Sequence, residues 1–186
     1  MSVKSVAVYC ASRKGNDARH EHTAAALGAA LAHSGIEVVY GGGHVGLMGV
    51  VADAALHAGG RVTGVITESL VYAEVGHHAL SELITVPTMH ERKALMSARA
   101  DAFVMLPGGY GTLDEFFEAV TWSQLGIHDK PCIILDPTGF FAPLIQFLDD
   151  AVAADFIRPV NRALITYSRD VANVLTLLRS TALPNV

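Results

Sequence analysis

The sequence predicts an α/β fold in which a mostly parallel sheet carries helices on both faces and residues 1–186 form a single domain. Three observations support this prediction. Short apolar runs of strand length alternate with longer segments of helical periodicity, which is typical of right-handed βαβ units. Hydrophobic residues make up 51% of the 186 residues, and their richness in Ala, Val and Leu suits strands that are covered on both faces. Finally, no repeat, low-complexity tract or linker divides the sequence into two units.

The first half of the chain is predicted to contain four strands, at residues 6–10, 36–40, 62–66 and 83–86. Asn16 or Asp17 is expected to cap the helix after the first strand, and Gly35 to end it. A second helix is predicted over residues 47–56. Residues 67–81 are the least periodic part of the chain, and we expect a loop with a helical turn there.

The second half continues the alternation. Pro87 and Thr88 are expected to begin a helix over residues 89–100. A buried strand at 101–106 follows, and the helix after it ends near Gln124. The remaining predicted elements are a strand at 132–135, a helix at 140–152, a strand at 163–167 and a helix at 170–178.

The turn after the strand at 101–106 is the main functional signal in this sequence. It reads Pro107-Gly108-Gly109-Tyr110-Gly111-Thr112. Three glycines in one strand-to-helix turn let the backbone approach a ligand closely, because no Cβ blocks the approach. The N–H groups and the positive dipole end of the helix then favour an anion, most simply a phosphate. The turn therefore predicts a nucleotide site.

A second glycine run, Gly41-x-Gly43-x-x-Gly46, matches the dinucleotide fingerprint, with Glu68 about 20 residues further on. That fingerprint usually opens the first βαβ unit, whereas here it follows the second predicted strand. Three interpretations compete: binding of NAD, a wall of another nucleotide pocket, and a tight turn without a ligand. We favour the second interpretation, in which Gly43 contacts the nucleotide.

The start of the helix at 89–100 combines a structural signal with an unusual charge. Thr88-x-x-Glu91 forms a capping box, which gives Glu91 a structural role. Arg92 and Lys93 fall in the first turns, where the helix dipole disfavours cations. A broken local rule of this kind marks a functional site or a compensating anion, although long cations also coat solvated helix faces. Because the carboxyl ends of parallel strands share one edge, we expect Arg92 to hold a phosphate or carboxylate there.

Glu115 lies one turn into the helix after the glycine turn, and two interpretations remain open for it. Thr112-x-x-Glu115 also matches a capping box, so the carboxylate has either a structural role or a catalytic one. Asp114 and Glu118 suit a helix start and are assigned structural roles. Ser12 follows the first strand at the same sheet edge. Its hydroxyl either bonds a base or phosphate or only shapes its turn.

Charge and composition argue against several other kinds of partner. The net charge of −5 gives no basic footprint for nucleic acid. The apolar segments stop short of the ~18 residues that a membrane span requires, and residues 1–10 lack the apolar core of a signal peptide. The two cysteines lie in strand-like runs, which is typical of buried thiols in a reducing cytoplasm. The nine histidines lack the spacing of a metal site, so no metal ion is expected.

In this order, the Gly41-Gly42-Gly43 run, the Met89-x-x-Arg92-Lys93 segment and the glycine turn resemble the LONELY GUY (LOG) family. Its members are cytokinin riboside 5′-monophosphate phosphoribohydrolases, often mislabelled as lysine decarboxylases. The resemblance runs from the first strand to about Lys130 and, more loosely, to the end of the chain. It implies a Rossmann-like fold, a homodimer with sites near the subunit interface, and neither cofactor nor metal ion.

The resemblance also implies a reaction and a set of site residues. An N6-modified adenosine 5′-monophosphate and water give the free base and ribose 5-phosphate. By position, Arg92 and Glu115 look like the catalytic pair. The implied substrate contacts are Glu74, Met89, Lys93, Gly108, Thr121 and a phosphate cradle of Gly109, Tyr110, Gly111 and Thr112.

Physical chemistry and the resemblance lead to the same predicted mechanism. Cleavage of an N-glycosidic bond builds positive charge on the ribose, as in glycoside hydrolysis. Glu115 beneath the sugar would stabilise that charge, and Arg92 would neutralise phosphate and hold Glu115 ionised. The competing hypothesis is a non-enzymatic carrier of a nucleotide or of molybdenum cofactor, since such carriers look like relatives of this fold. A carrier needs the phosphate cradle but not the Arg92–Glu115 pair. The sequence does not determine which base modification is preferred.

Overall fold

The computed structural model describes residues 3–180 with the exception of residues 75 and 78. Its strands are β1 (Ser5–Tyr9), β2 (Glu37–Tyr40), β3 (Val62–Thr67), β4 (Glu82–Val86), β5 (Ala102–Met105), β6 (Cys132–Leu135) and β7 (Ile165–Ser168). They form one sheet in the order β4-β3-β2-β1-β5-β6-β7, and every neighbouring pair is parallel. The predicted α/β fold is confirmed, and the sheet is parallel throughout these seven strands.

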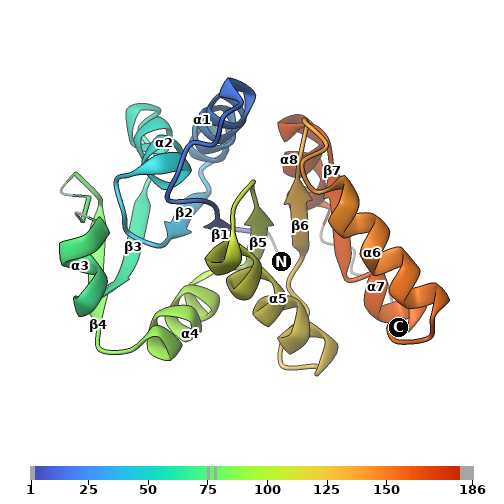
Figure 1. The fold of residues 1–186 in the computed structure, drawn as a ribbon. Helices are drawn as coiled ribbons and strands as arrows, with labels where there is room; N and C mark the ends of the chain where they lie inside the picture. Colours follow the sequence, from blue (N-terminus) through green and yellow to red (C-terminus); the bar gives the residue numbers. More distant parts are fainter. Residues whose placement is uncertain (1–2, 75, 78, 181–186) are drawn as a thin grey trace.

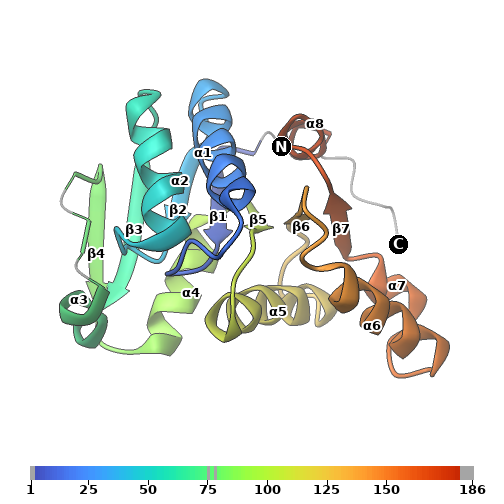
Figure 2. The same cartoon turned by 45° about the horizontal axis from the view of Figure 1, so that its top comes forward.

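Helices cover both faces of the sheet (Figures 1 and 2). One layer holds α1 (Ala18–His33), α2 (Gly46–His57) and α8 (Val171–Arg179), and the other holds α4 (Met89–Arg99), α5 (Tyr110–Gln124) and α6 (Ala142–Ala153). Successive strand side chains point to opposite faces. In β1, Val6 and Val8 therefore pack into the first layer and Ala7 and Tyr9 into the second. None of the helices that the structure describes is long and apolar enough to cross a membrane.

Capping side chains place the helix starts where the sequence predicts them. Asp17 caps α1, and its carboxylate accepts a hydrogen bond from the Arg19 backbone N–H at 2.9 Å. Gly35 follows α1 with a φ of +69°, a left-handed conformation that favours glycine. The Thr88 hydroxyl accepts from the Glu91 N–H at 3.2 Å and contacts the Glu91 carboxylate at 3.1 Å. Thr88 is thereby confirmed as the N-cap of α4, while the Glu91 side chain contacts the Thr88 hydroxyl.

Two segments differ from the predictions. Within residues 67–81, a helix α3 (Glu68–Glu74) follows β3 without an intervening loop, so the helical part is longer than the single turn expected. A short helix α7 (Pro159–Arg162) was not predicted, because four residues are too few to show helical periodicity. Residues 163 and 164 form the turn that follows α7, so β7 begins two residues later than the predicted strand at 163–167.

The direction of strand addition reverses at β1, which has β2 on one side and β5 on the other. Open α/β sheets bind ligands at the carboxyl ends of the strands, at such a reversal. The loop after β1 is tied to both neighbours here. The Ala11 N–H donates to the Pro107 carbonyl at 3.2 Å, and the Leu47 N–H in α2 donates to the Ala11 carbonyl at 3.0 Å. The starts of α2 and α5 therefore lie on either side of this loop.

Candidate active site

Arg92 is buried at the carboxyl edge of the sheet, with 6% of its surface exposed. Its side chain leaves the first turns of α4 and donates two hydrogen bonds to main-chain carbonyls. Nε donates to Val65 O at 3.0 Å, and Nη2 donates to Gly41 O at 3.1 Å. These two carbonyls, one in β3 and one just after β2, hold the guanidinium in place, so the unusual cation at this helix start is not a solvated surface charge.

Gly41 provides the space for this guanidinium. A Cβ at residue 41 would overlap Nη2 of Arg92 and would also lie 3.2 Å from the Met48 sulfur. The sequence analysis treated the Gly41 run as an NAD site, a wall of another nucleotide pocket or a tight turn, and it missed this contact. The available signal was a glycine at the very end of a strand, where a close approach by another group often requires one.

We expect Gly41→Ala to lower the free energy of unfolding by about 1–3 kcal/mol, because the added methyl group would clash with the Arg92 guanidinium. Urea unfolding of the parent, Gly41→Ala, Arg92→Ala and the double variant measures this cost. The methyl group should cost much less when Arg92 is already truncated. Gly111→Ala is the matched control, because a Cβ at residue 111 meets no atom within 4 Å. If Gly41→Ala lowered the free energy of unfolding equally in the parent and in Arg92→Ala, the methyl group would not destabilise the protein through Arg92.

Glu115 reaches the same place from α5. Its Oε1 lies 3.7 Å from Nη1 of Arg92, and the two side chains are 13% and 7% exposed. The two predicted catalytic side chains therefore form a largely buried ion pair. Tyr9, the last residue of β1, also lies close by. Burial raises the pKa of the Tyr9 phenol well above its ordinary value, and the Glu115 carboxylate raises it further. The phenol is thus neutral at ordinary pH, and sequence reasoning did not identify it.

The capping interpretation of Glu115 is wrong. α5 begins at Tyr110 with Gly109 as its N-cap, so Thr112 lies inside the first turn instead of before it. Thr112 is buried, and its side chain fills the space that a Cβ at residue 108 would occupy. With glycine at residue 108, Thr112 can pack against it, and the helix starts earlier than the Thr112-x-x-Glu115 pattern predicted. Thr112 is therefore not the N-cap of this helix, and the predicted Thr112-x-x-Glu115 capping box does not describe its start.

The N-terminal end of α5 is exposed to solvent. Gly109 and Gly111 are exposed, and Tyr110 between them is 95% exposed. Neither glycine has a positive φ, and a Cβ on either would meet nothing within 4 Å. Nothing in the described fold therefore requires glycine at these two positions. The first N–H groups of a helix have no partner within it, and they favour an anion.

Lys93 lies beside Arg92 but contacts α5. Its ammonium is 3.0 Å from the Asp114 carboxylate and 3.1 Å from that of Glu118, and its side chain is 10% exposed. Burial alone would lower the pKa of Lys93, but the two hydrogen-bonded carboxylates outweigh it and raise the pKa. The structural roles predicted for Asp114 and Glu118 are consistent with these pairs. The predicted substrate contact of Lys93 stays a prediction.

Three further predicted contacts lie at the same sheet edge. Ser12 is exposed in the loop after β1, and the backbone of this residue packs directly against Gly46. Gly43 is buried and forms an isolated bridge with Gly76. The Met89 sulfur accepts a 3.5 Å contact from Nη1 of Arg92, and the residue is 41% exposed. The sequence thus brings these positions to the edge that holds Arg92.

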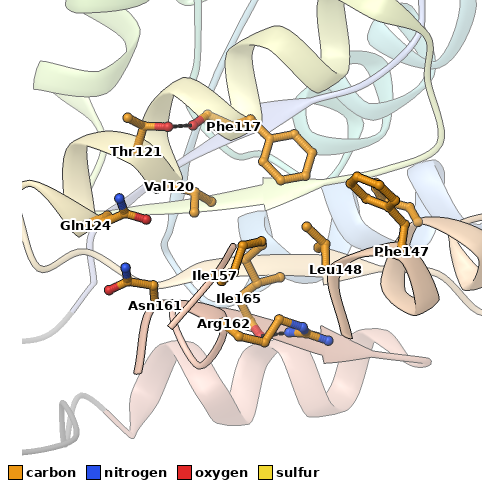
Figure 3. A pocket seen from close by; sticks show the side chains of 11 residues that line it. Phe117, Val120, Thr121, Gln124, Phe147, Leu148, Ile157, Asn161, Arg162 and Ile165 are labelled. Carbon is orange, nitrogen blue, oxygen red and sulfur yellow. Dashed lines mark hydrogen bonds between the residues drawn. The ribbon is translucent and has the colours of Figure 1, made fainter. Parts of the chain in front are cut away.

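Thr121 is not gathered there, and Glu74 cannot be placed from the described residues. Thr121 lies six residues, or about 9 Å of helix, beyond Glu115, and its hydroxyl donates to Phe117 O at 2.7 Å. It lines a groove of about 400 Å³ between α5, α6 and α7 (Figure 3), whose other lining residues include none of the predicted site residues. Glu74 ends α3, and its side chain lies outside the described part of the structure.

Other chemistries find little support in the described residues. Across residues 3–180, apart from 75 and 78, no group of three or more His, Cys, Asp or Glu side chains could hold a metal ion. Cys10 and Cys132 are free and buried. Burial raises the pKa of the Cys132 thiol to about 12, and that of Cys10 rises still further. Thiols with such pKa values are not nucleophiles at ordinary pH.

Comparison with known proteins adds the following findings. The model of a family described as possible lysine decarboxylases matches residues 48–178. The cytokinin riboside 5′-monophosphate phosphoribohydrolase of Rhodococcoides fascians is 44% identical over 178 residues, which are 95% of this chain and 90% of that protein. The enzyme named LOG from Oryza sativa subsp. japonica is 49% identical over 163 residues, 87% and 67% of the two chains.

Among solved structures, the chain resembles the molybdenum cofactor binding protein of Rippkaea orientalis. The TM-score is 0.72 at 21% identity, and the match covers 97% of this chain and 98% of that one. At this identity the likeness concerns the fold alone, which is Rossmann-like.

Proposed function

Because this chain belongs to the family of the cytokinin riboside 5′-monophosphate phosphoribohydrolases, we propose that it hydrolyses the N-glycosidic bond of adenosine 5′-monophosphates, including N6-modified ones. The products are the free base and ribose 5-phosphate. The observation that carries this proposal is the buried Arg92–Glu115 pair, whose nearest charged atoms are 3.7 Å apart. A simple carrier of nucleotides or of molybdenum cofactor has no need of such a pair.

The proposed chemistry follows from where charge develops. As the glycosidic bond breaks, the ribose gains positive charge. The Glu115 carboxylate, which Arg92 favours in its ionised form, would stabilise this charge and orient the attacking water. A fixed carboxylate in a site with little water acts more strongly than one in solution, because it need not reorient during the reaction. In this scheme, Arg92 also offers a positive charge to the substrate phosphate.

We place the substrate phosphate on the open start of α5. Gly109 and Gly111 leave room for it, and the helix dipole favours its charge. The ribose would then extend towards Glu115, one turn along the same helix. Further substrate contacts are proposed from Ser12, Gly43, Glu74, Met89, Gly108, Tyr110 and Thr112. The whole chain would act as one nucleotide-binding domain.

Gly111→Ala is expected to raise the KM for adenosine 5′-monophosphate about tenfold or more, because the methyl group displaces the phosphate from charge-assisted hydrogen bonds worth ~1.5–3 kcal/mol. Its stability should be unchanged or slightly higher, since alanine favours a helix over glycine. Steady-state kinetics and urea unfolding measure the two effects. Binding of adenosine, which has no phosphate, should not change. A parent-like KM for the nucleotide would remove residue 111 from the phosphate site.

The function is tested directly by a base-release assay. The protein is incubated with adenosine 5′-monophosphate, with its N6-isopentenyl analogue and with adenosine, and products are separated by liquid chromatography. We expect one equivalent of free base and one of ribose 5-phosphate from a nucleotide, and no release from adenosine. Nucleotides that bind but stay intact would favour a carrier instead. Comparing the rates for the two nucleotides also measures the preference for an N6 substituent.

We also propose that the chain forms a homodimer through the surface around the α5–α6–α7 groove. Large apolar side chains are exposed on and after these helices: Leu125, Ile127, Phe147, Phe156 and Val160. Large exposed apolar side chains favour protein contacts. Thr121 lines this groove, so in the proposed dimer any contact between Thr121 and substrate would lie near the subunit interface. Sedimentation equilibrium should give twice the chain mass of 19.7 kDa, and a monomer at assay concentrations would refute this proposal.

The cytoplasm is the proposed compartment, because Cys10 and Cys132 are both free and buried. Such thiols suit a reducing environment. Fractionation of the source cells, followed by detection of the protein, tests this assignment, and recovery from an oxidising compartment would contradict it.

A further inference from the structure

The proposed catalytic pair spans two helices that a second ionic contact also joins. Arg92 and Lys93 are consecutive in α4, and Asp114 and Glu115 are consecutive in α5. The ammonium of Lys93 lies 3.0 Å from the Asp114 carboxylate and 3.1 Å from the Glu118 carboxylate. Two neighbouring residues of α4 therefore each face a carboxylate of α5: Arg92 faces Glu115, and Lys93 faces Asp114.

The contact of Lys93 is well placed to fix the separation of the helices. Asp114 and Glu118 are four residues apart, so they lie on one face of α5 in successive turns. The Lys93 side chain is 10% exposed and that of Glu118 is 25% exposed, while Asp114 is 59% exposed. Partly buried pairs are screened less by salt than exposed ones. One ammonium thus holds two turns of α5 against α4.

The hydrogen bonds of Arg92 do not perform this task. Its Nε and Nη2 donate to Val65 O and Gly41 O, which belong to the sheet edge on the α4 side. The contact with Glu115 is longer, at 3.7 Å. The guanidinium is therefore fixed to the sheet, whereas the carboxylate moves with α5. A displacement of about 1 Å at a reacting centre can reduce the rate by about a hundredfold.

We propose that Lys93 is a positioning residue whose ion pairs with Asp114 and Glu118 hold α5 so that the Glu115 carboxylate stays against the Arg92 guanidinium. This inference rests on the proposed hydrolase function and gives Lys93 a role distinct from substrate contact. The two roles make opposite kinetic predictions. A residue that positions the carboxylate affects kcat, whereas a residue that binds the phosphate of substrate affects KM.

The test uses variants on both sides of the contact. Lys93→Met removes the ammonium, and the double variant Asp114→Asn/Glu118→Gln removes its partners but leaves Lys93 intact. We expect each to lower kcat for adenosine 5′-monophosphate about ten- to hundredfold with little change in KM. The triple variant should be no slower than either, because all three changes break one contact. Lys93→Arg, which keeps the charge and the reach, should retain most of the activity.

Glu82→Gln is the matched control. The Glu82 carboxylate also holds two cations, Arg61 at 3.1 Å and Arg99 at 2.9 Å, but at the amino end of β4, away from the proposed site. Its loss should leave kcat unchanged. The inference is overturned if Lys93→Met raises KM while Asp114→Asn/Glu118→Gln leaves kcat at the parent value. If the parent itself releases no base, the hydrolase function fails, whereas an active parent with unaffected carboxylate variants refutes only the positioning role.

Discussion

Glu115→Gln should retain nucleotide binding and lose most of the base release, with kcat reduced on the order of a hundredfold or more. Glutamine has nearly the same shape as glutamate, so the site stays filled, but the negative charge that stabilises the developing positive ribose is gone. Losing one preorganised electrostatic contact typically raises the barrier by ~3 kcal/mol. Titration calorimetry with adenosine 5′-monophosphate measures binding, and the base-release assay measures kcat.

The substitution also removes the charge that faces the buried Arg92 guanidinium. Thermal unfolding should therefore show a loss of stability, because a buried charge loses its partner. If Glu115→Gln released base at the parent rate, the carboxylate would have no catalytic role and the hydrolase would need another group to stabilise the ribose.

Arg92→Ala should impair both binding and turnover, lowering kcat/KM by roughly a hundredfold or more. Truncating one partner of a buried, hydrogen-bonded charge pair typically costs ~2–5 kcal/mol. The change removes a positive charge from the substrate phosphate, leaves Glu115 without its cation, and takes the donors from the carbonyls of Gly41 and Val65. Steady-state kinetics and binding titration measure both effects.

Arg92→Lys serves as the charge-conserving comparison. An ammonium is a single point of charge and cannot reproduce the planar fork that bonds two carbonyls and faces a carboxylate. We expect it to restore phosphate binding in part and turnover only slightly. Parent-like kinetics for Arg92→Ala would remove the guanidinium from the site and, with it, the main support for the hydrolase.

The fold was largely predictable because its signals are local. Alternating apolar runs and helical periodicity identified all seven strands, and capping at Asp17 and Thr88 placed two helix starts. The short helix α7 and the extent of α3 were not predicted, because both are too short for periodicity to show. The start of α5 was misplaced since the packing of Thr112 against Gly108 is a close contact that no propensity encodes.

The site was predictable only in outline. Arg92 was recognisable because a cation stands at a helix start, and the glycine turn was recognisable from its composition. The contact between Gly41 and Arg92 joins residues 51 positions apart, and the contact of Lys93 with Asp114 joins residues 21 positions apart. Such contacts depend on how helices pack across a sheet, which residue spacing does not determine. The structure supplied them.

The anchors of Arg92 also bear on how mutation can affect this protein. Both acceptors, Val65 O and Gly41 O, are main-chain atoms. Every amino acid carries such an oxygen, so no codon change deletes the acceptor at residue 65, and one apolar side chain there can replace another over generations. Within the surroundings of Arg92, sensitivity to mutation therefore falls on positions whose side chain, or lack of one, matters: Arg92 itself, the facing Glu115 and Gly41.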